Sequence, residues 1–201
     1  KEANAKHGFT AEQTLEIAQK LYEKKLITYP RTGSRYIPED VFVEIPKLLA
    51  FIGNLPKWKE KINPKVVPTR RSVDSGKVTD HHALLVTGEK PLFLSKEDNT
   101  IYQMIAGRMI EAFSEKCVKD TATVMAECAG VEFMAKGSII KQAGWRAVYG
   151  EEEKEETIIP GWQEGDTLTL KAASITEGKT KPKPLHTEAT LLSAMETAGK
   201  E

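Results

Sequence analysis

The sequence of 201 residues contains little cysteine, no net charge and no long apolar run. Two cysteines are too few for a disulfide framework and are typical of a reducing compartment. No stretch approaches the roughly 18 to 20 apolar residues that a membrane span needs. The start, KEANAKHGF, has neither a Met nor the apolar core of a signal peptide. We therefore expect a cytoplasmic protein without a membrane partner, and the missing Met predicts a piece of a longer chain.

The charges balance, since 29 Lys and Arg residues oppose 29 Asp and Glu residues, so bulk charge predicts no nucleic-acid partner. Their distribution is uneven. From Lys57 to Arg71 six basic residues oppose only Glu60, with Trp58 among them. A cationic surface with an aromatic ring suits single-stranded nucleic acid, and a solvated loop is the alternative. Residues 151–156 hold five acids and one lysine, for which we expect an exposed turn without a catalytic role.

The first predicted helix is the clearest element. Thr10 and Gln13 have the spacing of a capping box, in which each side chain bonds a backbone N–H at the helix start. Apolar residues then recur at helical intervals: Leu15, Ala18, Tyr22 and Leu26, with Ile17 and Leu21 beside them. The pattern predicts a helix over residues 10–25, which ends near Tyr29 because Pro30 disfavours helical angles in the residue before it.

Three further helices are predicted. One covers residues 38–51, opens with proline and acids, and is expected to break in two at Pro46. The second covers residues 96–115, with an apolar face at helical spacing. The third follows a cap at Thr187. Residues 54–86 have no sustained period.

Near Lys119 the pattern changes from helical to β. Residues 122–141 are rich in β-branched residues with partial alternation, and Gly130 suits a hairpin turn. GWRAVYG and DTLTLKAASI predict further strands, and GKTKPKP predicts a linker. The predicted fold class is α+β. The predicted domains are a mainly helical one over residues 1–119, an antiparallel β segment over residues 120–185, and the start of another helical domain over residues 186–201.

Within the segment LITYPRTGSRY, residues 26–36, the eight positions 28–35 gather one phenol, two guanidiniums and three aliphatic hydroxyls. Arginine forks and hydroxyls bind phosphate oxygens, and a tyrosine can attack phosphorus to form a phosphotyrosine ester. An unperturbed phenol is protonated at neutral pH, so a cation such as Arg31 would have to favour the phenolate. From these residues alone, a half-buried tyrosine before a turn with solvated arginines is the alternative.

The segment DHHALLVT, residues 80–87, places two adjacent histidines after an acid. Such histidines can hold phosphate, shuttle protons or bind metal. Metal is disfavoured, because adjacent histidines project apart and neither cysteine has ligand-like spacing. The alternative is one buried and one exposed histidine. No cluster of acids with metal-ligand spacing occurs in the sequence, so no metal site is predicted.

LITYPRTGSRYIP closely resembles the active-site segment of type IA DNA topoisomerases, where a tyrosine in an ITYPRTDSRY-like stretch attacks single-stranded DNA. GFTAEQTLEIAQKLYEKKLITYPRT resembles the helix that leads into that tyrosine, and DHHALLVT resembles the family's DHHAIIPT segment. HTEATLLSAMETAGKE resembles the start of the family's next domain. The similarity is greater to bacterial topoisomerase III than to topoisomerase I. It implies a helical domain carrying the tyrosine, followed by part of a β-rich gate domain.

The resemblance implies roles for individual residues. Tyr29 falls on the nucleophile, Arg31 on the arginine beside it, and His81 on the histidine near the scissile strand. His82 occupies a position that varies in the family. The catalytic residues implied are Tyr29, Arg31 and His81, and the DNA-binding residues are Arg31, Ser34, Arg35 and His81. Gly33 stands where the family has Asp, and Val86 stands where it has a proline.

The implied function is transient cleavage of one DNA strand through a 5′-phosphotyrosine, passage of another strand, and religation without ATP. The implied cofactor is Mg²⁺, held with a catalytic lysine by an N-terminal domain that this sequence lacks, so this chain is expected to bind no metal and to be inactive alone. We expect a monomer, a nucleoid location, single-stranded DNA as partner and a helicase as a second partner. The alternatives are a non-catalytic DNA-binding module and a tyrosine recombinase, which the early position of Tyr29 disfavours.

Overall fold

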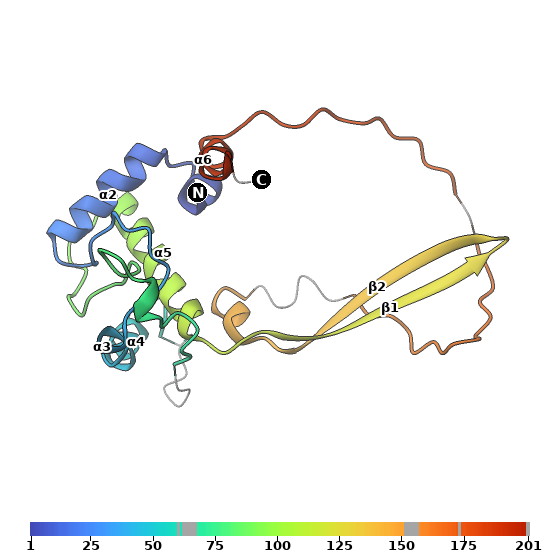
Figure 1. Cartoon of the computed structure of the whole chain (residues 1–201), viewed down its shortest axis with the longest axis horizontal. Helices are drawn as coiled ribbons and strands as arrows, with labels where there is room; N and C mark the ends of the chain where they lie inside the picture. Colours follow the sequence, from blue (N-terminus) through green and yellow to red (C-terminus); the bar gives the residue numbers. More distant parts are fainter. Residues whose placement is uncertain (60, 62–67, 151–156, 173, 200–201) are drawn as a thin grey trace.

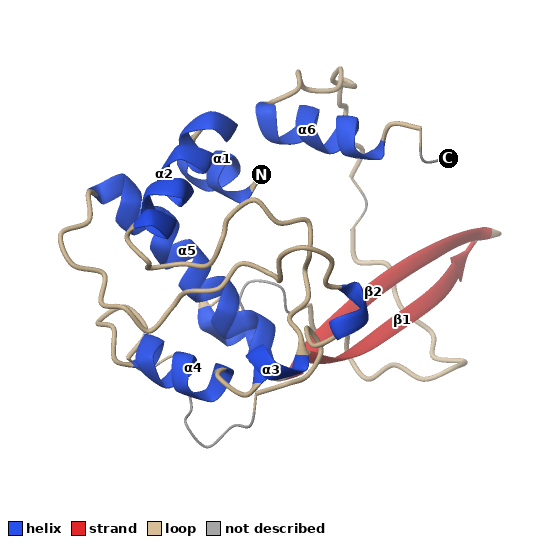
Figure 2. Cartoon of the chain, turned by 60° about the vertical axis from the view of Figure 1, so that its left-hand side comes forward, coloured by secondary structure: helices blue, strands red, loops and turns tan. Residues whose placement is uncertain are grey.

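The computed structural model describes residues 1–59, 61, 68–150, 157–172 and 174–199, which form a helical body and a long β-hairpin (Figure 1). The α-helices are α1 (Glu2–His7), α2 (Ala11–Glu23), α3 (Glu39–Phe42), α4 (Ile45–Gly53), α5 (Lys96–Phe113) and α6 (Glu188–Thr197). The strands are β1 (Val118–Cys128) and β2 (Val131–Gln142), and two 3₁₀ helices are η1 (Ser75–Lys77) and η2 (Gly144–Val148). The α+β class is confirmed, with most helices preceding the hairpin in the chain (Figure 2).

Helix α2 begins as predicted. The Gln13 N–H donates to Thr10 Oγ1 at 3.1 Å, and the Thr10 N–H donates to Gln13 Oε1 at 3.0 Å, which completes the capping box. The buried residues of α2 are Ile17, Ala18 and Leu21. Leu15 and Tyr22, predicted to lie in the apolar stripe, are each 39% exposed. The buried face of α2 is therefore narrower than the sequence pattern predicts.

Helix α5 lies at the centre of the core and packs against α2 and η2 (Figure 1). Its start is capped by Ser95, whose Oγ accepts the Asp98 N–H at 3.0 Å. Its buried apolar residues are Ile101, Tyr102, Ala106, Met109, Ile110 and Phe113. A Cβ added at Gly107 would lie 2.0 Å from Tyr149 Oη and 2.8 Å from Trp58 Cη2, so both rings pack directly on the helix backbone. The helix predicted over residues 96–115 is confirmed.

Trp58 belongs to this core and is only 1% exposed. Its Nε1 donates to Gln103 Oε1 at 2.7 Å, and its ring meets Tyr149 edge-on at 5.7 Å. The prediction that Trp58 offers a stacking surface to nucleic acid is therefore wrong, because its ring is covered by protein. Glu60 and Lys65 of the same basic run lie outside the described residues.

The helix predicted over residues 38–51 is divided, as expected, into α3 and α4. Pro46 stands in the first turn of α4, where its missing N–H costs no helical hydrogen bond. Helix α1 has no counterpart among the predicted helices. Its C-cap is Gly8, at φ 72, and the Gly8 N–H donates to Asn4 O at 2.9 Å.

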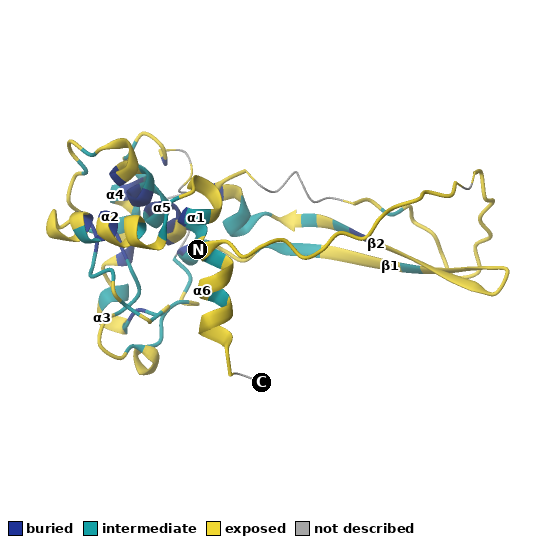
Figure 3. Cartoon of the chain, turned by 90° about the horizontal axis from the view of Figure 1, so that it is seen from above, coloured by how far each residue is buried: buried dark blue, intermediate teal, exposed yellow. Residues whose placement is uncertain are grey.

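Strands β1 and β2 form the predicted antiparallel hairpin, with Cys128 opposite Val131. The two turn residues, Ala129 and Gly130, have φ of 50 and 78, as a tight two-residue turn requires. Most side chains of both strands are exposed (Figure 3). The hairpin therefore extends away from the core and not over it.

Two strand predictions are wrong. GWRAVYG contains η2, in which Val148 is buried. The Trp145 N–H donates to the carbonyl of Glu115, which follows α5, and the Arg146 N–H donates to the carbonyl of Ala143. The described residues of DTLTLKAASI are not in a strand. Alternation is not sufficient for a strand, since its backbone also needs a neighbouring edge to pair with. The acidic segment, residues 151–156, lies outside the described residues.

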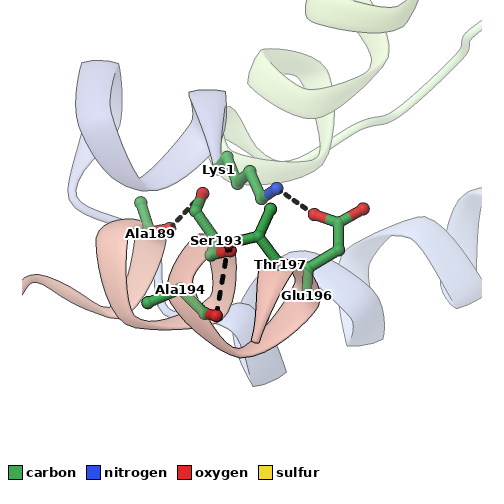
Figure 4. A network of polar contacts seen from close by, with 6 residues as sticks. All are labelled: Lys1, Ala189, Ser193, Ala194, Glu196 and Thr197. Atoms are coloured by element: carbon green, nitrogen blue, oxygen red, sulfur yellow. Dashed lines mark hydrogen bonds and ion pairs between the residues drawn. The ribbon is translucent and has the colours of Figure 1, made fainter. Parts of the chain in front are cut away.

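The C-terminal helix α6 returns to the helical body and lies beside α1 (Figures 1 and 2). It starts with a capping box between Thr187 and Thr190. Lys1 forms an ion pair with Glu196, which Figure 4 shows next to the Ser193 and Thr197 hydroxyls bonded to carbonyls of α6. Within the described part of the chain, none of the helices combines the length and apolar character needed to cross a membrane.

Candidate active site

The segment after α2 is held by a short antiparallel bridge between Ile27 and Val86. Both residues are buried in the core. The Thr28 N–H donates to Leu85 O at 2.9 Å, and the Leu85 N–H donates to Thr28 Oγ1 at 2.9 Å. These bonds bring the two sequence motifs side by side. They also place Tyr29, the next residue, at the surface with a half-buried side chain.

The ring of Tyr29 lies between two other aromatic rings. Its centroid is 4.5 Å from that of His81, with the planes inclined by 46°. Its centroid is 5.3 Å from that of Tyr22, with the planes nearly perpendicular at 77°. The structure thus brings Tyr29 and His81 together, as their proposed roles require. The sequence did not predict the contact of Tyr22 with Tyr29, because the helical spacing of Tyr22 matches a core position. The polar hydroxyl of Tyr22 was the one signal that this side chain could lie at the surface.

The hydroxyls of the loop are used to hold its shape. Thr32 Oγ1 donates to the backbone carbonyl of His81 at 2.8 Å and accepts the Ser34 N–H at 3.1 Å. Ser34 Oγ accepts the Tyr36 N–H at 3.1 Å and lies 3.2 Å from the carbonyl of Lys77. Ser34 therefore fixes the turn in this structure, and its assignment to DNA binding stays a prediction.

Arg31 lies on the side of the loop that faces α2. It borders an open hollow of about 510 Å³ together with Glu12, Glu16 and Glu23. Among the described residues, no carboxylate is within ion-pair distance of Arg31. Its guanidinium is exposed, as is that of Arg35. Both arginines can therefore meet an incoming anion without first breaking an ion pair.

A further cation, Lys77, lies beside Tyr36 at the end of the loop. The Lys77 ammonium is 4.7 Å from the centre of the Tyr36 ring and 2.9 Å from Asp74 Oδ2. The hydrogen bond from Lys77 lowers the pKa of Asp74, and the same bond raises the pKa of Lys77. Lys77 therefore keeps its charge at neutral pH.

The two histidines differ in environment. His81 is exposed, whereas His82 is half-buried and its Nδ1 lies 2.7 Å from the carbonyl of Ala83. A Cβ added at Gly33 would meet no atom within 4 Å, so the aspartate that the resembled family has there would fit.

The described residues do not fit a metal ion. No three of their His, Cys, Asp and Glu side chains come together as ligands for one. The described residues therefore supply no set of ligands for Mg²⁺.

Comparison with known proteins identifies similar sequences over the whole length. The family described as DNA topoisomerase matches residues 1–199. The chain is 35% identical over 210 residues to DNA topoisomerase 3 of Bacillus subtilis and 38% identical over 210 residues to that of Bacillus licheniformis. It is 36% identical over 214 residues to DNA topoisomerase 3 of Bacillus cereus. The alignments cover 98 to 100% of this chain but only 29% of each relative.

Proposed function

The chain belongs to the DNA topoisomerase family, and from this premise we propose that Tyr29 is the nucleophile of a type IA enzyme that cuts one DNA strand. The observation that carries the proposal is the surface position of the Tyr29 ring between Tyr22 and His81, with the unpaired guanidinium of Arg31 on the same loop. A phenol can act as the nucleophile toward a phosphodiester, a histidine can transfer its proton, and a cation can stabilise the charge that develops on the phosphate.

The proposed step is an exchange of one phosphodiester for another. The phenol oxygen of Tyr29 bonds to phosphorus, and the bond from phosphorus to the 3′ oxygen breaks. The phenol loses one proton and the departing 3′ oxygen gains one. His81 is proposed to carry the proton, and the 4.5 Å separation of its ring from that of Tyr29 supports this role. The tyrosyl ester keeps the energy of the broken bond, so the reverse step reseals the strand without ATP.

Arg31 is proposed to stabilise the charge that gathers on the non-bridging oxygens as phosphorus becomes five-coordinate. Its exposure supports this role, as does the absence of an ion pair between it and any described carboxylate. Arg35, on the same loop, is proposed to bind neighbouring phosphates of the strand. These contacts would orient single-stranded DNA across the loop.

The complete reaction is proposed for a larger enzyme, because this chain spans 29% of the length of its relatives. We propose that Mg²⁺ is held by residues outside the described part of this chain, and that this chain is inactive alone. The hairpin β1–β2 is proposed to belong to the gate that opens for strand passage. We also propose that this chain is monomeric, and that the larger enzyme acts on the nucleoid with a helicase as partner.

The test is to trap a covalent adduct between the whole enzyme and a single-stranded oligonucleotide. A label at the 3′ end of the DNA should remain on the protein, and a label at the 5′ end should appear in a free, shortened product. Tyr29→Phe should abolish the adduct, whereas Tyr149→Phe, which removes a phenol far along the chain, should leave it. Intact binding of DNA without any adduct would instead indicate a non-catalytic DNA-binding module.

A further inference from the structure

We propose that Tyr22 is a positioning residue for the nucleophile: with His81 it forms an aromatic clamp that fixes the direction of the Tyr29 phenol. The clamp is defined as the rings of Tyr22, Tyr29 and His81. Its catalytic consequence rests on the proposed function of Tyr29, whereas the contact itself does not.

The geometry of the clamp is that of favourable aromatic pairs. Such pairs have ring centroids 4.5 to 7 Å apart and prefer edge-to-face or offset arrangements. Tyr22 meets Tyr29 at 5.3 Å and 77°, and His81 meets it at 4.5 Å. The two contacts come from separate parts of the chain, the last turns of α2 and the segment after η1. A rotation of the Tyr29 side chain would therefore break at least one of them.

The core does not account for Tyr22. It is 39% exposed and is not among the buried residues that pack α2 against the body. Among the described aromatic pairs, the one that includes Tyr22 is its contact with the ring of Tyr29.

The backbone before Tyr29 is already fixed, which leaves the direction of the phenol to the ring contacts. The bridge of Ile27 with Val86 and the bonds of Thr28 hold the chain up to the residue before it. Helix α2 is itself anchored by its capping box and by packing on α5. Tyr22 therefore contacts the Tyr29 ring from a helix whose own position is fixed. Attack on phosphorus needs the oxygen in line with the departing group, and a misdirected nucleophile loses much of its rate.

The expected effect follows from the strength of one aromatic pair, which corresponds to about threefold to tenfold in the population of the correct orientation. Tyr22→Leu should lower the single-turnover rate of cleavage by that factor. The affinity for single-stranded DNA should stay within about twofold, because Tyr22 is not proposed to touch the strand. Tyr22→Phe keeps the ring and should retain most of the rate.

The cleavage experiment uses the whole enzyme and a 3′-labelled oligonucleotide at saturating protein. Val43→Ala is the control, since it trims an exposed apolar side chain at the end of α3 and not one beside Arg31, and it should leave the cleavage rate unchanged. Thermal unfolding of each variant reports whether α2 is intact. The proposal would be overturned if Tyr22→Leu cleaved at the wild-type rate, or if it lowered the cleavage rate and the affinity for single-stranded DNA by the same factor.

A second measurement tests the clamp without DNA. In this chain, labelled at tyrosine rings for NMR, Tyr22→Leu should shift the ring signals of Tyr29, and Val43→Ala should not. Unmoved Tyr29 signals would refute the clamp even if Tyr29 is the nucleophile. If the wild-type enzyme forms no adduct while the signals do shift, the proposed function fails and the clamp stands as a structural contact.

Discussion

Replacement of Gly107 by alanine measures how tightly the core is packed on α5. Glycine in a helix interior is less favourable than alanine by about 1 kcal/mol, so at an open position the substitution should stabilise the protein. At Gly107 the added Cβ would lie 2.0 Å from Tyr149 Oη and 2.8 Å from Trp58 Cη2. Both separations are shorter than ordinary van der Waals contact, so a ring or the helix has to move.

The cost depends on which ring can move. Tyr149 is partly exposed and can swing outward, whereas Trp58 is buried and is held by its bond to Gln103. Overpacking of a core costs about 1 to 3 kcal/mol, and the gain in helix propensity offsets about 1 kcal/mol of it. We expect a net destabilisation of about 1 to 2 kcal/mol. For a chain of this size that corresponds to a fall in Tm of roughly 2 to 8 °C.

Urea and thermal unfolding, followed by tryptophan fluorescence, measure this difference. Gly33→Ala is the control, because a Cβ there meets no atom within 4 Å, and its stability should change by less than about 0.5 kcal/mol. Tyr149→Ala combined with Gly107→Ala should cost less than the sum of the two single variants. If Gly107→Ala instead stabilised the protein by about 1 kcal/mol, the full gain in helix propensity, the packing of these rings on α5 would be refuted.

The remaining predictions concern the site and one buried phenol. Arg31→Ala should lower cleavage by about 10²- to 10³-fold and DNA affinity far less, with Arg31→Lys recovering part of the rate; equal losses would make Arg31 a binding residue only. Tyr29→Phe should cost stability on the order of 1 kcal/mol or less, and a larger loss by urea unfolding would contradict its surface position. This chain alone should neither cleave nor relax DNA with Mg²⁺, and relaxation would disprove the need for a larger enzyme. Burial raises the pKa of Tyr102 to about 12, whereas a tyrosine in the unfolded chain titrates near pH 10. The stability that this difference represents is present below pH 10 and lost as the pH rises to 12. The free energy of unfolding, measured at pH 9 and at pH 11, should therefore fall less between the two pH values in Tyr102→Phe than in the wild type.

Sequence reasoning succeeded where the structure depends on residues close together in the chain. The capping box of Thr10 and Gln13, the turn at Gly130 and the break near Pro46 each involve only a few neighbouring residues. The roles of Tyr29, Arg31 and His81 came from a resemblance over several motifs. Those roles stay proposals, while the family that they indicated is confirmed.

Sequence reasoning failed where a residue's environment depends on distant segments. Trp58, which stands among lysines in the sequence, is covered by Gln103 and Tyr149 from other elements. The alternation of DTLTLKAASI predicted a strand, but a strand also requires an edge for its backbone, and periodicity does not contain that information.

The sequence by itself determined the helices with strong caps, the hairpin, the α+β class and the family, because short-range hydrogen bonding and motif order suffice for these. Only the tertiary structure decided what surrounds the proposed nucleophile. The bridge between Ile27 and Val86 brings the histidine motif beside Tyr29. The last turn of α2 brings the ring of Tyr22 into contact with that of Tyr29. Helical periodicity assigned Tyr22 to the core, yet burial of α2 is completed by other side chains, so its ring remains free to contact Tyr29.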